Sequence, residues 1–366
     1  MRFRFPFKRR QSYGLNHILG TGQSLALGTY GSPVLSETQP YNNKMFSVPC
    51  NPLTLTSLND LIEDTQESMS SGLSNFVTSL APTHDALVSV SALGGTDYNG
   101  LKKGTTAYDD AIDQVTAGLA RAGELEVTYG VTAITVVHGE ADGQLDPPTP
   151  NYDDMVTEWQ ADYQADIQAI TGQTETIPLF HTQMSALTDS DIPLAQLRAH
   201  ISAPGRVILV GPKYHFPNVD GSHLTNHGYR QLGEYHAKVY HKVIVLGEVW
   251  QPLRPRNVSI AGAVITIQFY VPEPPLVLDT DLVDPATNYG FIWDGGGEAI
   301  TSVDIVSDDT VTITLDGTPA APGQIKYAQQ PAATNAGNLR DSDATESLHG
   351  YALYNWCVHF SETVEA

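Results

Sequence analysis

The sequence predicts an α/β protein with a parallel sheet, followed by a small antiparallel β-sandwich. Over the first two thirds of the 366 residues, short apolar segments alternate with longer segments whose apolar residues recur at helical spacing. This alternation is typical of a parallel sheet whose strands are joined by crossover helices. After the two prolines in the segment 251–256, the pattern changes to strands of alternating polarity between Gly, Pro and Asp turns.

The first part of the chain is expected to hold the parallel sheet, and we assign it to a domain at 15–250. Its strand segments are rich in apolar or β-branched residues, as in strands that are buried on both faces. The expected strands are 15–19, 86–91, 132–138, 177–181 and 207–211. The expected helices are 107–122, 152–170, 194–201 and 224–239.

The second part, 251–366, is expected to form an ancillary β-sandwich. Its strands are predicted at 264–271, 302–306, 310–315 and 351–360. A fibronectin-like or carbohydrate-binding module fits this size and pattern. The sequence does not reveal whether such a module binds glycan.

Charge and composition limit the partners that this protein can have. The formal net charge is −22, so a nucleic-acid backbone would be repelled, and we expect no nucleic-acid partner. No run of eighteen apolar residues occurs, so no membrane partner is expected either. The two cysteines, Cys50 and Cys357, lie far apart in the sequence and are expected to be free thiols.

The first 14 residues form a basic, aromatic arm. Phenylalanines alternate there with the basic residues Arg2, Arg4, Lys8, Arg9 and Arg10. We expect a flexible or docking arm, which could attach the protein to a larger assembly; binding to nucleic acid or to an anionic surface is the alternative. No apolar segment of a signal peptide follows these charges, and an extracellular or virion-associated location is left open.

Ser24 is the candidate nucleophile. It lies in a Gly-rich segment, 20–28, just after the first expected strand, and we expect a helix to begin there. The N–H groups and dipole at a helix N-terminus would then stabilise developing negative charge. Ala26 stands where the Gly-x-Ser-x-Gly elbow of α/β-hydrolases needs glycine, so that elbow is not matched. The alternative role of Ser24 is a plain helix cap.

Asp220 and His223 are the candidate partners of this serine. Three residues apart on a tight turn, the carboxylate can reach the Nδ1–H of the imidazole and leave Nε2 facing the serine. His223 would then act as the general base and Asp220 would orient it. The alternative is an Asp turn before the last expected helix, with an incidental histidine. His227, one helical turn further on, is expected to serve packing or the surface.

Four motifs at the ends of expected strands resemble those of the SGNH (GDSL-like) hydrolases, in the branch of sialate O-acetylesterases and related carbohydrate acetylesterases. In chain order they are Gly22-Gln23-Ser24, Gly94-Gly95-Thr96, His138-Gly139-Glu140 and Asp220-Gly221-Ser222-His223. The resemblance covers about residues 15–245 and implies a flavodoxin-like three-layer domain. It also implies a serine esterase that removes O-acetyl groups from a carbohydrate through an acyl-enzyme, with no cofactor.

The expected oxyanion hole combines three donors. Gly95, favoured over its neighbour Gly94, supplies a backbone N–H, because glycine permits unusual backbone angles and close approach; a plain loop glycine is the alternative. Ser24 supplies its own N–H. The resemblance assigns the third donor to His138, although the family usually has Gln there; the alternative is a hydrogen-bonded core histidine. Glu140 is expected to hold its loop in place.

Two other classes of function stay open. A metal-dependent hydrolase could draw ligands from His138, Glu140, Asp142, Asp220 and His223, although no His-Glu-x-x-His motif or Cys/His cluster is present. A glycan-binding tail or adhesion module could use an esterase-like fold without catalysis. The intact set of Ser, His and Asp argues against this second class, since a pure binder has no need to retain all three.

Overall fold

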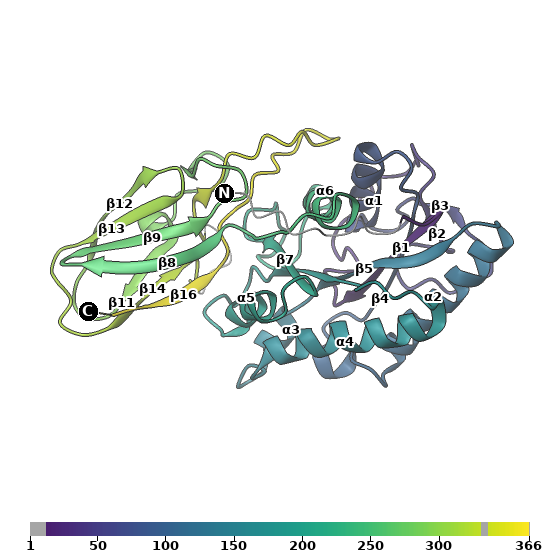
Figure 1. Cartoon of the computed structure of the whole chain (residues 1–366), viewed down its shortest axis with the longest axis horizontal. Coiled ribbons are helices and arrows are strands. Elements are labelled where there is room, and N and C mark those ends of the chain that lie inside the picture. Colours follow the sequence, from purple (N-terminus) through teal and green to yellow (C-terminus); the bar gives the residue numbers. More distant parts are fainter. Residues whose placement is uncertain (1–11, 331–335, 366) are drawn as a thin grey trace.

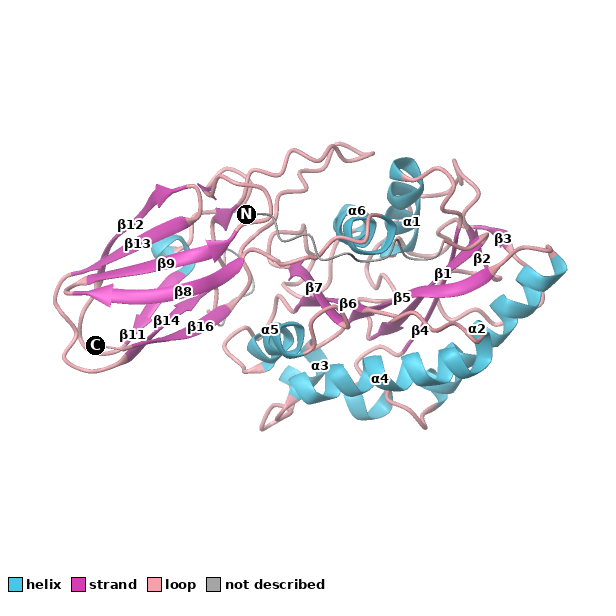
Figure 2. Cartoon of the chain, viewed as in Figure 1, coloured by secondary structure: helices cyan, strands magenta, loops and turns pink. Residues whose placement is uncertain are grey.

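The computed structural model describes residues 12–330 and 336–365. The basic residues of the arm predicted at 1–14 lie outside these residues, so the docking role stays a prediction. A layered α/β part and a β-sandwich lie side by side (Figure 1). Figure 2 shows that the helices gather in the first part, while the second consists almost wholly of strands.

The central sheet has seven strands in the order β3-β2-β4-β1-β5-β6-β7. Its strands are β1 (Leu15–Gly22), β2 (Lys44–Met45), β3 (Asn59–Asp60), β4 (Ala86–Ala92), β5 (Tyr129–Val137), β6 (Leu179–Gln183) and β7 (Val207–Pro212). The five long strands are parallel to one another, and only β3 pairs antiparallel, at the edge. Taken alone, the five long strands follow the order 2-1-3-4-5, so the predicted flavodoxin-like sheet is confirmed.

Helices cover both faces of this sheet. They are α1 (Met69–Leu80), α2 (Thr106–Glu124), α3 (Glu140–Gly143), α4 (Tyr152–Thr171), α5 (Ile192–Ser202) and α6 (Asn226–Tyr240). One apolar core joins α1 and α6 to one face, and a second joins α2, α4 and α5 to the other. The two groups lie above and below the strands in Figure 1, which gives the three layers that the sequence predicted.

The five strands and four helices expected at the ranges given above are present, with ends that differ by a few residues, whereas the helix expected to begin at Ser24 is absent. Helix α1 was not predicted, because its sequence is rich in serine and carries a glycine, both poor helix formers. Tertiary contacts explain it: the Ser68 hydroxyl caps the helix by accepting from the Ser70 N–H, and most of the helix is buried against α6. Single-turn elements complete the part, namely η1 (Tyr98–Gly100) and the π-helix η2 (His241–Val245).

The β-sandwich contains two main antiparallel sheets. The first has the order β12-β13-β9-β8 and the second the order β11-β14-β16. Their strands are β8 (Arg254–Ala261), β9 (Val264–Tyr270), β11 (Phe291–Asp294), β12 (Ile300–Ser307), β13 (Thr310–Leu315), β14 (Gly323–Tyr327) and β16 (Phe360–Val364). A short pair, β10 (Val277–Leu278) with β15 (Leu339–Arg340), and the turn η3 (Thr287–Gly290) lie beside them. Apolar side chains from both sheets share one core, as in other sandwiches.

The prediction of a strand at 351–360 is wrong over most of that range, because β16 begins only at Phe360. The segment 341–359 instead runs back along α6, where Figure 1 shows it in yellow. Side chains of α6 take the place of a strand partner: the Gln231 Nε2–H donates to the Ala352 carbonyl at 2.9 Å. The Lys238 ammonium, buried in the same contact, pairs with Asp343 at 2.9 Å and with the Asn355 side chain at 2.7 Å.

Both cysteines are free thiols in the structure, Cys357 fully buried and Cys50 partly so. Within residues 12–330 and 336–365, none of the helices is both long enough and apolar enough to cross a membrane.

Candidate active site

The predicted site residues gather at the carboxyl ends of the parallel strands. Ser24 follows β1, the glycine pair Gly94-Gly95 follows β4, and His138 follows β5. His223 comes from the connection between β7 and α6. Ligands of open parallel sheets bind beyond the carboxyl ends of the strands, so the position of these residues agrees with the general rule for the fold.

Ser24, His223 and Asp220 form a continuous hydrogen-bonded chain. The Ser24 Oγ lies 2.8 Å from His223 Nε2, and His223 Nδ1 lies 2.9 Å from Asp220 Oδ2. A carboxylate can only accept, so Nδ1 carries the proton of a neutral ring and Nε2 accepts from the serine hydroxyl. This is the geometry in which an imidazole acts as general base toward a serine.

The carboxylate of Asp220 both builds the turn and orients the ring. Its Oδ1 accepts the backbone N–H of His223 at 2.7 Å and that of Ser222 at 3.0 Å, while Oδ2 accepts from the imidazole. Partial burial raises the pKa of Asp220, but these hydrogen bonds outweigh it, and the pKa lies below its ordinary value. The Asp220 side chain is 42% exposed and the His223 side chain only 21%, so solvent reaches the carboxylate more easily than the imidazole.

The helix predicted to begin at Ser24 is absent. Residues 23–30 instead form a series of turns, in which the Ser24 carbonyl accepts from the N–H groups of Leu27 and Thr29. Gly28 ends any helical continuation, since its φ is +74° and a Cβ there would lie 2.3 Å from the Glu67 carbonyl oxygen. A helix dipole therefore does not act on Ser24.

Two backbone N–H groups beside Ser24 are unused. Within the described residues, neither the N–H of Ser24 nor that of Gly95 has a hydrogen-bond acceptor. The glycine pair lies next to the serine, because a Cβ placed on Gly94 would be 3.8 Å from Ser24 Cβ. Gly95 has a φ of +67°, which glycine adopts without strain. These two groups are therefore available as oxyanion donors.

His138 is not available for the role that the resemblance assigned to it. Its Nε2 lies 2.9 Å from the Thr96 carbonyl oxygen, which can only accept, so Nε2–H donates there and not to an oxyanion. Its Nδ1 accepts from the Tyr152 hydroxyl at 2.6 Å. The ring is buried, and burial lowers its pKa, so it stays neutral. The structure thus supports the core-histidine alternative and corrects the assignment of His138 as a direct donor.

The loop after β5 holds the loop after β4 at several points. Besides the His138 bond to Thr96, the Asp142 Oδ2 accepts the Tyr98 N–H at 2.9 Å. Glu140 is buried and pairs with Lys213 at 2.5 Å, which agrees with the structural role expected for it. With these carboxylates so engaged, the described residues contain no group of three or more His, Cys, Asp or Glu arranged to hold a metal ion.

Two further residues near the site were placed only by the structure. His227, expected to serve packing or the surface, is exposed and bonds to the Tyr351 hydroxyl at 2.9 Å. Tyr30, which the sequence analysis did not single out, packs edge-on against the His223 ring with centroids 5.0 Å apart. The only sequence signal for Tyr30 is its place between two glycines.

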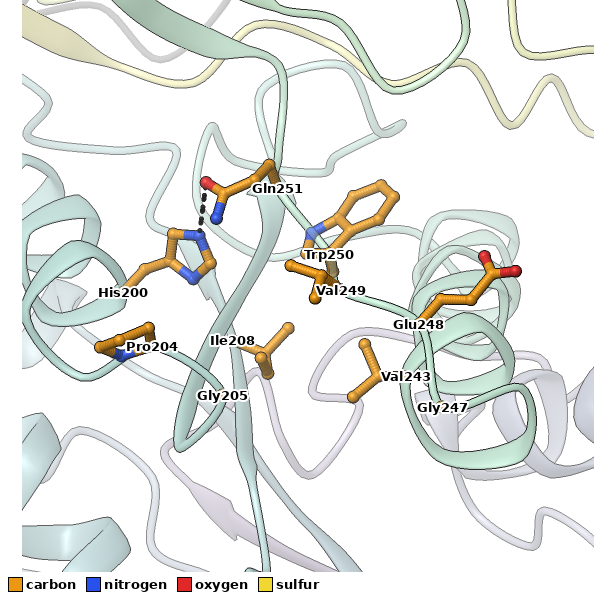
Figure 3. A pocket seen from close by; sticks show the side chains of 10 residues that line it. All are labelled: His200, Pro204, Gly205, Ile208, Val243, Gly247, Glu248, Val249, Trp250 and Gln251. Carbon is orange, nitrogen blue, oxygen red and sulfur yellow. Dashed lines mark hydrogen bonds between the residues drawn. The ribbon is translucent and has the colours of Figure 1, made fainter. Parts of the chain in front are cut away.

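A cavity of about 230 Å³ lies elsewhere, near the start of β7 and the end of α6 (Figure 3). Its walls include Ile208, Val243 and Trp250, and on one side His200 bonds to Gln251 at 3.3 Å. Ile208 belongs to the amino end of its strand, whereas the serine site lies at the carboxyl ends. Neither Ser24 nor His223 lines this cavity.

Comparisons with known proteins support the fold. Neither a protein-family model nor a curated protein sequence matches this chain. Among solved structures, a carbohydrate acetylesterase from Xanthomonas citri superposes with a TM-score of 0.66 over 95% of this chain and 80% of its own, at 15% identity. A protein from Arabidopsis thaliana is also similar, with a TM-score of 0.49 at 16% identity over 62% of this chain and 97% of its own. So is NanS, with a TM-score of 0.44 at 12% identity over 63% of this chain and 98% of its own.

The likeness to the Xanthomonas citri enzyme extends over both the α/β layers and the β-sandwich, since it covers nearly the whole chain. The predicted three-layer α/β fold followed by a β-sandwich is confirmed.

Proposed function

We propose that this chain is a serine esterase that removes O-acetyl groups from a carbohydrate. The observation that carries the proposal is the hydrogen-bonded chain from Asp220 through His223 to Ser24, with distances of 2.9 and 2.8 Å. The two unused N–H groups beside the serine add a place for a negatively charged oxygen.

The proposed reaction has two halves. Ser24 Oγ attacks the ester carbonyl while His223 Nε2 takes its proton, and the same imidazolium then protonates the departing sugar hydroxyl. The N–H groups of Ser24 and Gly95 stabilise the tetrahedral oxyanion. Water then attacks the acetyl carbon and gives a proton to His223. The bond between that carbon and Ser24 Oγ breaks, His223 returns the proton to Ser24 Oγ, and acetic acid is released. Each proton that His223 accepts is returned, so no cofactor is required.

The choice of acetate and sugar rests on likeness. The sequence motifs resemble those of carbohydrate acetylesterases, and the Xanthomonas citri structure is named as such an enzyme. The hydrogen-bonded chain itself supports only the coarser statement that an ester is cut. We further infer that residues 15–250 carry the reaction, that 251–366 form an ancillary domain, and that the basic arm attaches the protein to a larger assembly.

Hydrolysis of p-nitrophenyl acetate tests the proposal. Ser24→Ala is expected to lower kcat/KM by about 10⁴-fold or more, because the acyl-enzyme cannot form. Ser222→Ala is the matched control: its backbone N–H still donates to Asp220, and its rate is expected to stay within about twofold of wild type. Both measurements are repeated with a chelator, which is expected to have no effect.

Three results would contradict the proposal. Equal rates for wild type and Ser24→Ala would remove the serine from the mechanism. Loss of activity with the chelator would favour a metal-dependent hydrolase. Glycan binding by a wild-type protein that hydrolyses none of a panel of acetate esters would favour a binding module.

A further inference from the structure

Tyr30 combines a strained backbone with an exposed ring. Its φ is +70°, a conformation that bulky residues rarely adopt, yet its side chain is 57% exposed. Core packing therefore does not explain why this residue is held in an unfavourable conformation. Strain of this kind gathers at ligand-binding and active sites, where a fixed orientation of the side chain is useful.

Hydrogen bonds on both sides of Tyr30 fix the loop that carries it. The Thr29 carbonyl accepts from the Tyr229 hydroxyl of α6 at 2.8 Å. On the other side, the Gly31 N–H donates to the Gly28 carbonyl at 2.8 Å, and the Gly31 carbonyl accepts from the Glu67 N–H at 2.9 Å. The backbone on either side of Tyr30 is thus tied to α6 and to the segment before α1.

The carboxylate of Glu67 continues this attachment. It is buried and accepts the N–H groups of Leu35 at 2.7 Å and Ser36 at 2.9 Å. It also lies 3.4 Å from Arg230 of α6. Hydrogen bonds thus join the segment on both sides of Tyr30 to α6 and to the residues before α1, which suits a residue that presents its ring in one place.

The ring of Tyr30 packs against His223, whose Nε2 bonds to the Ser24 hydroxyl. It meets the His223 ring edge-on, with centroids 5.0 Å apart and planes at 83°. Two other exposed apolar side chains come from neighbouring loops: Leu93, 53% exposed, whose N–H donates to the Gly22 carbonyl before Ser24, and Val219, 56% exposed, whose N–H donates to the His223 carbonyl. The loops after β1, β4 and β7 thus each carry one exposed apolar or aromatic side chain that is close in sequence to a site residue.

We propose that Tyr30 is the platform on which the pyranose ring of a neutral O-acetylated sugar rests while its acetyl group reaches Ser24. This inference rests on the proposed function. A pyranose has an apolar face of C–H groups and a polar edge of hydroxyls, and an aromatic ring with a polar tip matches both. The net charge of −22 and the partly exposed carboxylate of Asp220 disfavour an anionic sugar at the same place.

Two substitutions at Tyr30 distinguish the effect of the aromatic ring from the effect of the strained backbone. Tyr30→Gly removes the ring and relieves the strain, since glycine adopts a φ of +70° freely, so the variant is expected to fold at least as stably as wild type. Tyr30→Phe keeps the ring. Tyr289 is a matched control, because it is a tyrosine with a φ of +56° in the β-sandwich, far along the chain from the site.

Acetate release is measured by pH-stat on two substrates, xylopyranose tetraacetate and ethyl acetate, which has no ring. For Tyr30→Gly we expect kcat/KM on the sugar to fall about tenfold further than kcat/KM on ethyl acetate, which corresponds to the loss of one aromatic contact. Tyr30→Phe, which keeps the ring but lacks the hydroxyl, is expected to lose less on the sugar than Tyr30→Gly does. Tyr289→Gly is expected to behave as wild type on both substrates.

The outcomes separate this proposal from the proposed function. An equal fall on both substrates would overturn the platform and make Tyr30 a residue that orients His223. An unchanged rate on the sugar would also overturn it, as would faster hydrolysis of 9-O-acetyl-N-acetylneuraminic acid than of the xylose ester. Failure of the proposed function would appear elsewhere, as a Ser24→Ala variant that retains full activity on ethyl acetate.

Discussion

His138 and His223 are two imidazoles at one edge of the same sheet, and the structure gives them different environments. His223 lies in a turn after β7, is 21% exposed, and bonds to a carboxylate on one side and a serine hydroxyl on the other. His138 follows β5, is buried, and bonds to a tyrosine hydroxyl and a backbone carbonyl. The difference shows that the partners of the two ring nitrogens, more than position at the strand ends, indicate what a histidine can do.

The physical reason is the charge that each ring can carry. Asp220 can stabilise an imidazolium at His223, so that ring is able to take a proton during a reaction. Around His138, burial lowers the pKa even though the Asp142 carboxylate lies 3.6 Å from Nδ1. Both nitrogens of this ring are also already engaged, by the Tyr152 hydroxyl and the Thr96 carbonyl. His138 is therefore suited to hold the Thr96 carbonyl, and with it the loop of Gly94 and Gly95.

The largest effect expected from this comparison is at His223. His223→Gln is predicted to lower kcat/KM on p-nitrophenyl acetate by about 10³- to 10⁴-fold, because no group is left to take the Ser24 proton. His227→Gln is the matched control, four residues further along. It is expected to remain within about twofold of wild type, since its ring is exposed and bonds to the Tyr351 hydroxyl. Similar losses in both variants would refute the distinction.

A smaller effect is expected at His138. His138→Ala is predicted to lower kcat by about 10- to 100-fold with little change in KM, because the loop of Gly95 loses its bond at Thr96 and the donor N–H is less well placed. His138→Gln, whose amide N–H can donate to the same carbonyl, is expected to restore most of the rate.

Tyr152→Phe is the control that separates the loss of the Thr96 bond from a general loss of stability around His138. It leaves the Nε2 bond to Thr96 in place and removes only the partner of Nδ1. Its loss in kcat is expected to be smaller than that of His138→Ala, with thermal midpoints recorded for all three variants. A wild-type kcat in His138→Ala would show that this ring does not position the loop.

The smallest effect per residue concerns stability at mildly acidic pH. Burial lowers the pKa of His17 and His181 to about 3 and that of His84, His236 and His359 to about 4. Each folded pKa lies below the unfolded value of about 6.5, so the stabilisation is complete above that value and is lost as the pH falls below it. From pH 7 to pH 6, each such ring is expected to cost about 0.7 kcal/mol.

Urea unfolding at pH 7 and at pH 6 measures this loss. An unchanged free energy of unfolding between the two values would mean that the buried histidines are paired with groups that offset the penalty, and that burial alone does not distinguish them from His223.

Much of the fold followed from local patterns. The apolar segments of β1, β4, β5, β6 and β7 are contiguous in the sequence, so the parallel sheet and its crossover helices were predictable. The serine-rich helix α1 and the irregular segment 341–359 were not, because each depends on contacts with α6 that lie far away in the sequence. The same holds at Ser24, where Gly28 and the Glu67 carbonyl favour turns over the expected helix.

By itself, the sequence determined which residues could meet at the site: a serine directly after the first strand, and an Asp and a His three positions apart, a spacing short enough to form a turn without help from the rest of the chain. Only the tertiary structure decided that His138 donates to the Thr96 carbonyl and that the Tyr30 ring packs edge-on against His223. Both depend on partners in other loops, and no local pattern records which loops will meet once the sheet has formed.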